Sequence, residues 1–314
     1  MKDNSYAFAV SAVRVRETGL LTKTQTETLV TAEDVASVLR LLEDYGYSDA
    51  STDPEAAISD RMSSVTEFIK GVCPDDGLLS FLFVNNDFHN LKAAMKCSVS
   101  GIEPDRYFLP PSAISYGDVR RAVEEKRFAD LPEIFSSAEY AWNTLVKTMN
   151  GQMCEMILDR AAIEASVKIA AETEDEFCIG LADLRAKISA FVIAYRCAAA
   201  KKSKDFTSEA LPELCGIDKK ALVSAVLSGC DAVIAQAKRY GVPVDESDGV
   251  RELVLSAERC EDEYIARSMF ISMGPAPIIS YYLKAQREAS RIRVILSCKR
   301  CGLGEDVIRS RIGM

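Results

Sequence analysis

Signals that start helices recur along this chain, and they constrain its fold more than any other feature because each one fixes where a helix begins. Three pairs have the spacing of a capping box, in which an N-cap hydroxyl and an acidic or amide side chain satisfy amides at the helix start: Thr22 with Gln25, Ser115 with Asp118, and Ser136 with Glu139. Asp53 before Pro54 is a fourth signal, since proline suits the first position of a helix.

Apolar residues follow these signals at helical spacing. The segment "AEDVASVLRLLEDYGY" places Val35, Val38 and Leu42 on one face and ends near Gly46, where glycine favours a helix stop. Only 16 glycines and 10 prolines interrupt the chain, and no pair of strands with alternating β-branched residues is evident. The sequence therefore predicts an all-α protein with a dozen or more helices.

Size and charge narrow the class of protein. A chain of 314 residues exceeds the size at which single cores divide, so two or three domains are expected. The net charge of −9 argues against nucleic acid as a partner, because binding phosphates needs an excess of lysine and arginine. We find no signal peptide and no apolar run long enough to cross a bilayer, so any membrane association is expected to be peripheral.

One short segment, "NDFHNLKAAMKC", resembles a reactive site because it holds His89, the single histidine, near a cysteine. On a helix Cys97 would lie about 12 Å further along the axis, too far for His89 to act as its base. The ten cysteines are scattered through apolar sequence and indicate reduced, buried thiols, and the "CKRC" motif lacks further zinc ligands. A phosphate-binding G-x-x-x-x-G-K-[ST] motif is absent. We therefore predict no catalytic residues, no cofactor and no metal site.

The chain also resembles itself. An apolar residue beside a cation recurs before an apolar helix in three places: Asn90-Leu91-Lys92, Asp183-Leu184-Arg185, and Arg291-Ile292-Arg293. After the first two, Leu109-Pro110 aligns with Leu211-Pro212. A module of about one hundred residues used three times explains this pattern, and chance similarity between helical segments is the alternative.

Two terminal segments make a family resemblance specific. The run "YAFAVSAVRVRE" resembles the opening of the C subunit of archaeal and bacterial A/V-type ATP synthases, the counterpart of the d subunit of eukaryotic V-ATPases. The run "PIISYYLKAQREASRIRVILSCKRCGLGEDVIRSRI", with Tyr282, Glu288 and Arg293, is similar to the end of the same family. Between them "NDFHNLKAAMK" and "MILDRAAIEA" match in order. The repeats depart from one another, since Gly180 stands where the first has Asp87, which argues against a threefold binding site.

The resemblance implies a funnel of three similar helical domains around a pseudo-threefold axis, here residues 1–108, 109–210 and 211–314. It implies a non-catalytic central-stalk subunit of a rotary V/A-type ATPase or ATP synthase. Such a component couples the soluble axle to the membrane proteolipid ring during proton or sodium transport, on the cytoplasmic face of the membrane. The alternative is a helical adaptor that binds soluble partners.

The C-terminal residues offer a candidate partner interface. Residues 280–314 carry eight lysines and arginines against three acidic residues, which makes this end a basic pole. Lys284, Arg287 and Arg291 share a helix face that excludes Ile292, Ile295 and Leu296, so these cations could meet an acidic partner while the apolar face packs inward. Alternatively, they are solvated and complement acidic residues of this chain, such as those at 172–176.

Overall fold

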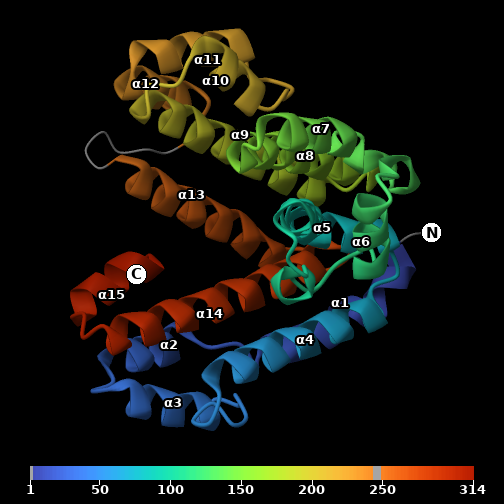
Figure 1. Cartoon of the computed structure of the whole chain (residues 1–314). Helices are drawn as coiled ribbons and strands as arrows, with labels where there is room; N and C mark the ends of the chain where they lie inside the picture. The colour runs from blue at the N-terminus through green and yellow to red at the C-terminus, as the bar shows by residue number, and fades with distance from the viewer. Residues whose placement is uncertain (1–2, 243–248) are drawn as a thin grey trace. The chain divides into compact units, whose positions relative to one another are not determined.

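The computed structural model describes residues 3–242 and 249–314, which form α-helices joined by short turns (Figure 1). These residues contain fifteen α-helices, four short 3-10 helices and no strand, so the all-α prediction is confirmed. The helices divide into two compact units. Unit 1 comprises residues 1–74 and 263–314, and unit 2 comprises residues 75–262. None of the described helices combines the length and apolar character needed to cross a membrane.

Unit 1 combines the two ends of the chain. Its elements are α1 (Asp3–Glu17), α2 (Lys23–Thr31), α3 (Val35–Asp44), α4 (Pro54–Val72), η4 (Arg267–Phe270), α14 (Ala276–Arg300) and α15 (Glu305–Ile312), together with the last residues of α13 (Gly249–Ala266). The long helix α14 contacts α1, α3, α4 and α15 (Figure 1). It is therefore the element around which the others in this unit pack.

The core of unit 1 joins residues from the beginning and the end of the sequence. Ile292, Ile295 and Leu296 of α14 are buried, as predicted for the apolar face of this helix. They pack in one cluster with Leu29 of α2 and Ile308 of α15. Each such side chain contributes about 1.5–3 kcal/mol when it leaves water, so this shared core stabilises the association of the two termini.

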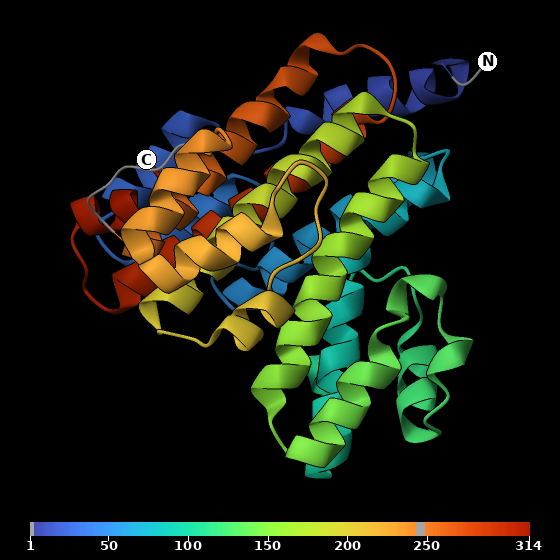
Figure 2. The same cartoon turned by 90° about the horizontal axis from the view of Figure 1, so that it is seen from above.

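Unit 2 is a continuous stretch of chain. Its elements are α5 (Asp76–Ser100), η1 (Asp105–Tyr107), α6 (Tyr116–Glu124), η2 (Phe128–Asp130), η3 (Glu133–Phe135), α7 (Ala138–Thr148), α8 (Gly151–Glu172), α9 (Glu176–Ala199), α10 (Lys204–Ala210), α11 (Lys219–Ser228), α12 (Cys230–Arg239) and most of α13. Helix α8 runs alongside α5 and also packs on α7 and α9 (Figure 2). A second cluster joins the end of α9 to α10, α11 and α12 through residues such as Phe191, Leu222 and Val233.

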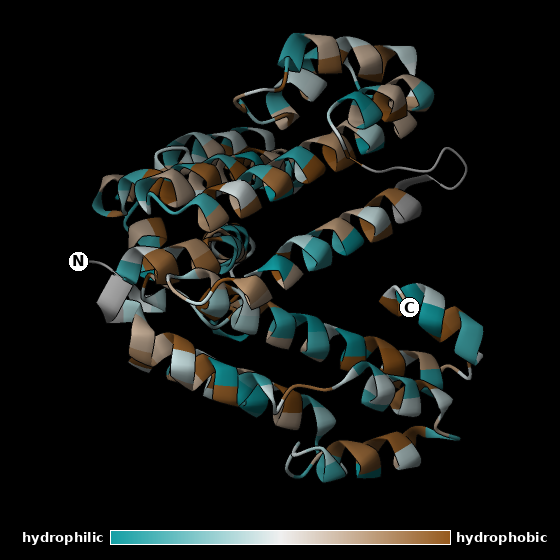
Figure 3. Ribbon diagram, turned by 180° about the vertical axis from the view of Figure 1, so that it is seen from behind, coloured by the Kyte–Doolittle hydropathy of each residue, from teal (hydrophilic) through white to brown (hydrophobic). Residues whose placement is uncertain are grey.

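Brown and teal residues alternate along the helices in both units, as expected for helices with one buried and one exposed face (Figure 3).

Most predicted helix starts are confirmed. Thr22 and Gln25 form a complete capping box at α2. Ser115 accepts from the amide of Asp118 at α6, and Asp53 caps α4 ahead of Pro54.

The predicted start at Ser136 is wrong, because α7 begins one residue later, with Ser137 at the N-cap. The amide of Ser136 bonds to the carbonyl of Glu133 at 3.0 Å, and its backbone is helical rather than extended. Ser137 is also helical in its backbone and makes no side-chain cap bond, so this helix start lacks a capping box.

The division into domains at residues 1–108, 109–210 and 211–314 stays a prediction. That division is based on repeated modules in the sequence, whereas the two units are compact groups of helices. The boundaries of the units fall after Pro74, between α4 and α5, and after Asp262, inside α13.

The core of unit 1 can be tested by truncating one side chain. Ile295 is fully buried, so Ile295→Ala should lower the free energy of unfolding by about 2–5 kcal/mol through lost burial and a residual cavity. Val307 lies nearby on α15 but is 42% exposed, and Val307→Ala should change it by less than about 0.5 kcal/mol. Urea unfolding followed by far-UV circular dichroism measures both. Equal effects would contradict this assignment of the core.

Candidate functional site

The three cations predicted to meet a partner lie on α14 and are all partly exposed. Lys284 is engaged within unit 1, because its Nζ lies 3.0 Å from Oε1 of Glu17. Glu17 also accepts from Arg14 at 2.7 Å. Lys284 therefore makes a contact inside its own unit. The role of Lys284, Arg287 and Arg291 as a partner interface stays a prediction.

Other cations of the basic pole also pair within unit 1. Arg293 lies 2.5 Å from Glu55 on α4, and Arg309 lies 2.6 Å from Glu27 on α2. The hydrogen bonds that Arg309 donates to Glu27, and then to Glu305, raise the pKa of Arg309. Arg293 and Arg309 thus pair with acidic residues of this chain. These acids lie on α2, α4 and α15, and not at residues 172–176.

A buried carboxylate holds the same part of unit 1 together. Glu288 on α14 is only 9% exposed. One of its oxygens accepts from the amide of Leu21 at 2.5 Å, and the other accepts from the hydroxyl of Tyr47 at 2.5 Å. Arg61 lies over the ring of Tyr47 and donates to the carbonyl of Gly19 at 2.5 Å. Glu288 therefore fixes the turn after α1 and the turn after α3 on one helix.

Burial also changes the acidity of these groups. Removal from water raises the pKa of Glu288, and this effect outweighs the hydrogen bonds from Tyr47 and Leu21 that lower it. The pKa of Tyr47 is raised as well, first by burial and then by the neighbouring carboxylate. Sequence reasoning named Glu288 only within a family resemblance and gave it no role. Its position among buried residues of an apolar helix was the available signal.

Unit 2 contains a similar polar cluster on α5. Asp87 accepts from the hydroxyl of Ser112 at 2.6 Å and from the amide of Ala113 at 2.9 Å. Asn90, which is fully buried, accepts from the amide of Leu109 at 2.7 Å and donates to the carbonyl of the same residue at 3.2 Å. These side chains satisfy backbone groups of the loop that follows η1, so the cluster fixes the loop on α5.

The cations that mark the repeats each pair with another helix of their own unit. Arg185 on α9 lies 2.5 Å from Glu261 on α13, and Lys92 on α5 pairs with Asp159 on α8. Arg293 on α14 pairs with Glu55, as described above. Their apolar neighbours Leu91 and Ile292 are buried, while Leu184 is half-buried and Asp183 pairs with Lys187 on its own helix. The three positions thus share a helix-bracing contact, and their role as marks of a repeat stays a prediction.

The segment that resembled a reactive site has structural contacts. Nε2 of His89 lies 3.2 Å from the carbonyl oxygen of Tyr107, at the end of η1 and next to the loop held by Asn90. Five cysteines are buried, namely Cys97, Cys154, Cys178, Cys197 and Cys298. Burial raises the pKa of Cys154 to about 11 and also raises that of Cys178, which opposes the thiolate that a nucleophile needs. In residues 3–242 and 249–314 no group of three acidic, histidine or cysteine side chains could hold a metal ion.

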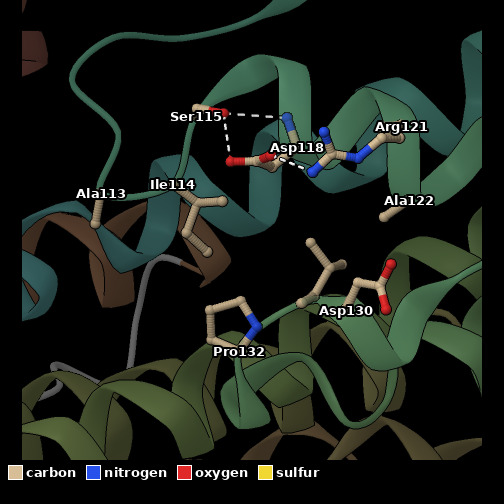
Figure 4. Close-up of a pocket in the computed structure, with 9 residues that line it drawn as sticks. Ala113, Ile114, Ser115, Asp118, Arg121, Ala122, Asp130 and Pro132 are labelled. Atoms are coloured by element: carbon tan, nitrogen blue, oxygen red, sulfur yellow. Dashed lines mark hydrogen bonds and ion pairs between the residues drawn. The ribbon is translucent and has the colours of Figure 1, made fainter.

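A pocket of about 390 Å³ in unit 2 is lined in part by polar side chains that pair with neighbouring residues (Figure 4). It lies at the start of α6, beside Asp130 and Pro132. Ser115 donates to Asp118 at 2.6 Å, and Arg121 donates to the same carboxylate at 2.6 Å. These bonds, that from Ser115 first, lower the pKa of Asp118. Ser115, Asp118 and Arg121 are thus bonded to one another at the start of α6, and Asp130 pairs with Arg127.

Comparison with known proteins gives two matches. The sequence profile of the ATP synthase (C/AC39) subunit family matches residues 9–311. The C subunit of the V-type sodium ATPase of Enterococcus hirae is 20% identical to this chain over 327 residues, which cover 96% of this chain and 95% of that protein. Both matches extend over nearly the full length, so they include unit 1 and unit 2 alike.

The cluster on α5 can be tested against its neighbour His89. Asn90→Ala removes a fully buried amide side chain and leaves the amide and carbonyl of Leu109 without their side-chain partner, which should lower the free energy of unfolding by about 2–3 kcal/mol. His89→Ala removes one partly exposed contact and should cost less than about 0.5 kcal/mol. Urea unfolding followed by the fluorescence of Trp142, which lies in the same unit, measures both. A larger loss for His89→Ala would overturn the structural interpretation of the segment.

The buried carboxylate should give unit 1 a characteristic pH dependence. Because the pKa of Glu288 is raised above its ordinary value of 4.5, the folded chain binds this proton more readily than the unfolded chain. The stability that the protonated Glu288 contributes is fully present below pH 4.5 and is lost as the pH rises through the raised pKa.

Unfolding free energies measured from pH 4 to pH 8 therefore should fall with rising pH in the wild type relative to Glu288→Gln, which cannot ionise. The exposed Glu67 on α4 provides the control, since Glu67→Gln should keep the wild-type pH dependence. Parallel curves for the wild type and Glu288→Gln would count against the raised pKa.

Proposed function

Because the chain belongs to the ATP synthase (C/AC39) subunit family, we propose that it is the central-stalk component that couples the soluble rotor axle to the membrane proteolipid ring of a rotary V/A-type ATPase or ATP synthase. The family and the relative assign it to an ion-transport complex, as the C subunit of a V-type ATPase. This subunit is not catalytic, so the chain is not an enzyme by itself. The observation that carries the proposal is the family match over residues 9–311.

The packing of the helices supports a mechanical role. A coupling must transmit torque, and closely packed protein interiors have low compressibility and transmit strain. Helices α5 and α14 have 25 residues each, which corresponds to about 37 Å. Each is braced against another helix by an ion pair, Lys92 with Asp159 and Arg293 with Glu55. These contacts resist sliding of the helices within each unit.

We place the chain on the cytoplasmic face of the membrane, where it would be held by the proteolipid ring rather than by a span of its own. The transported ion would be a proton or sodium. The relative from Enterococcus hirae belongs to a sodium ATPase by name, but a name at 20% identity does not decide the ion for this chain.

The partly exposed cations of α14 supply a candidate contact with one of these partners. Arg287 and Arg291 lie four residues apart on α14, which is about one turn, and both are partly exposed. Guanidinium groups pair with carboxylates in a planar, bidentate geometry. We therefore propose that an acidic segment of a neighbouring protein of the complex meets this face, and that the contact sets the orientation of assembly more than its affinity.

Reversing the charge of this face should weaken assembly. In the double variant Arg287→Glu with Arg291→Glu, an acidic partner would meet like charge, and recovery of the chain with the ring and the axle should fall roughly tenfold. The measurement is co-purification from detergent-solubilised membranes, together with ATP-driven ion pumping. Lys201→Glu with Lys220→Glu, at exposed positions of unit 2, is the matched control and should assemble normally.

Two further measurements keep this test decisive. The melting temperature of each isolated variant shows whether the substitution unfolds the chain, and the neutral pair Arg287→Gln with Arg291→Gln should have an intermediate effect on assembly. Normal assembly and pumping of the charge-reversed variant would remove this face from the interface. A wild-type chain that co-purifies with neither the ring nor the axle would instead refute the central-stalk role.

A further inference from the structure

Unit 1 exposes a group of large apolar side chains, which we name the α1–η4 patch. Its members are Phe8, Val15, Met269, Phe270 and Met273. The exposed fraction is 73% for both Phe8 and Val15, 67% for Met269 and 83% for Phe270. Isolated apolar residues on a surface need no explanation, but a contiguous group of them marks an interaction site.

Hydrogen bonds join the two parts of this patch. Phe8 and Val15 lie seven residues apart and therefore on the same face of α1. Arg14, beside Val15, donates to the carbonyl of Ser268 at 2.8 Å and to that of Ile271 at 3.2 Å. These two carbonyls flank Met269 and Phe270, so the segment that carries them is fixed against α1.

The patch is held in place before any partner binds. Glu17 orients Arg14 at 2.7 Å and is itself bonded to Lys284 of α14 at 3.0 Å. Ser268, next to Met269, is fully buried. A surface that is already ordered loses little conformational freedom when it docks, which favours binding. The exposed side chains thus stand on a supported backbone.

Charges beside the patch indicate the chemistry of its partner. Arg16 and Arg267 are exposed, and their guanidinium groups lie over the rings of Phe68 and Tyr264, at 4.8 Å and 5.2 Å from the ring centroids. Residues 6–17 and 264–275 together carry three arginines and one glutamate, in a chain whose net charge is −9. A complementary partner would present an apolar face with an acidic rim.

We propose that the α1–η4 patch is the surface through which this chain docks on the exposed end of the proteolipid ring, an inference that rests on the proposed function. If one chain docks on a ring of repeated proteins, it meets a surface of different symmetry. Apolar contact is non-directional and tolerates such a mismatch better than ion pairs of fixed geometry. Met269 and Met273 suit this task because methionine adapts to irregular surfaces.

The test compares binding of the full-length chain to two purified partners, the proteolipid ring in detergent and the axle. Met269→Ser with Phe270→Ser removes the most exposed part of the patch and should weaken binding to the ring by at least roughly tenfold. Binding to the axle should not change. Phe270→Leu keeps an apolar side chain and should retain most of the affinity for the ring.

A matched control lies in unit 2, where Tyr140 and Met149 are 53% and 69% exposed. Tyr140→Ser with Met149→Ser should bind the ring like the wild type. The melting temperature of isolated Met269→Ser with Phe270→Ser should equal that of the wild type, and a clear decrease would mean that the rest of this chain covers the patch, which would overturn the docking proposal.

The two proposals can fail separately. Normal ring binding by the double variant, or a loss of axle binding instead, would overturn the docking surface and leave the central-stalk role intact. A wild-type chain that binds neither partner would refute the central-stalk role, and the docking surface with it.

Discussion

The carboxylate of Glu288 is the contact on which unit 1 depends. It lies on α14 and supplies the acceptor for the amide of Leu21 and for the hydroxyl of Tyr47. A buried amide or hydroxyl without a partner costs about 1–3 kcal/mol, so both turns need this side chain where it is. The cost of burying the carboxylate appears as its raised pKa. Burial of Glu288 thus removes its carboxylate from water, and in return the side chain fixes the positions of two turns.

In unit 2 a loop is likewise held by buried polar side chains, here a carboxylate together with a neutral amide. Asp87 and Asn90 of α5 bond to backbone groups of Leu109 and Ala113, in a loop that lacks regular secondary structure of its own. In both units a 25-residue helix carries the buried polar side chain, and the turns or loop supply its partners, which are backbone amides together with a side-chain hydroxyl. The polar residues inside α5 and α14 are therefore needed for the loops to fold, and neither set forms a reactive site.

Local features of the fold were predictable from the sequence, whereas distant pairings were not. The caps at Thr22 and Asp53 and the buried face of α14 follow from spacing over a few residues, and the structure confirms them. The start at Ser136 failed because a preceding 3-10 turn took its amide. The pairing of Arg309 with Glu27 joins residues 282 positions apart, and helical periodicity carries no information on such a distance. For the same reason the pairing of Lys284 with Glu17 could not be predicted from the sequence.

Because of these distant pairings, the two ends of the chain depend on each other to fold. Leu21 and Tyr47 lie in the first fifty residues, and their acceptor Glu288 lies near the end of the chain. Loop-closure entropy must be overcome before contacts of such separation contribute to stability. Helices α1 to α4 can therefore form early by local propensity and capping, but their turns stay unsatisfied until α14 is present. Since Arg14 and Glu17 also link α1 to η4 and α14, the α1–η4 patch is ordered only when both ends of the chain have come together.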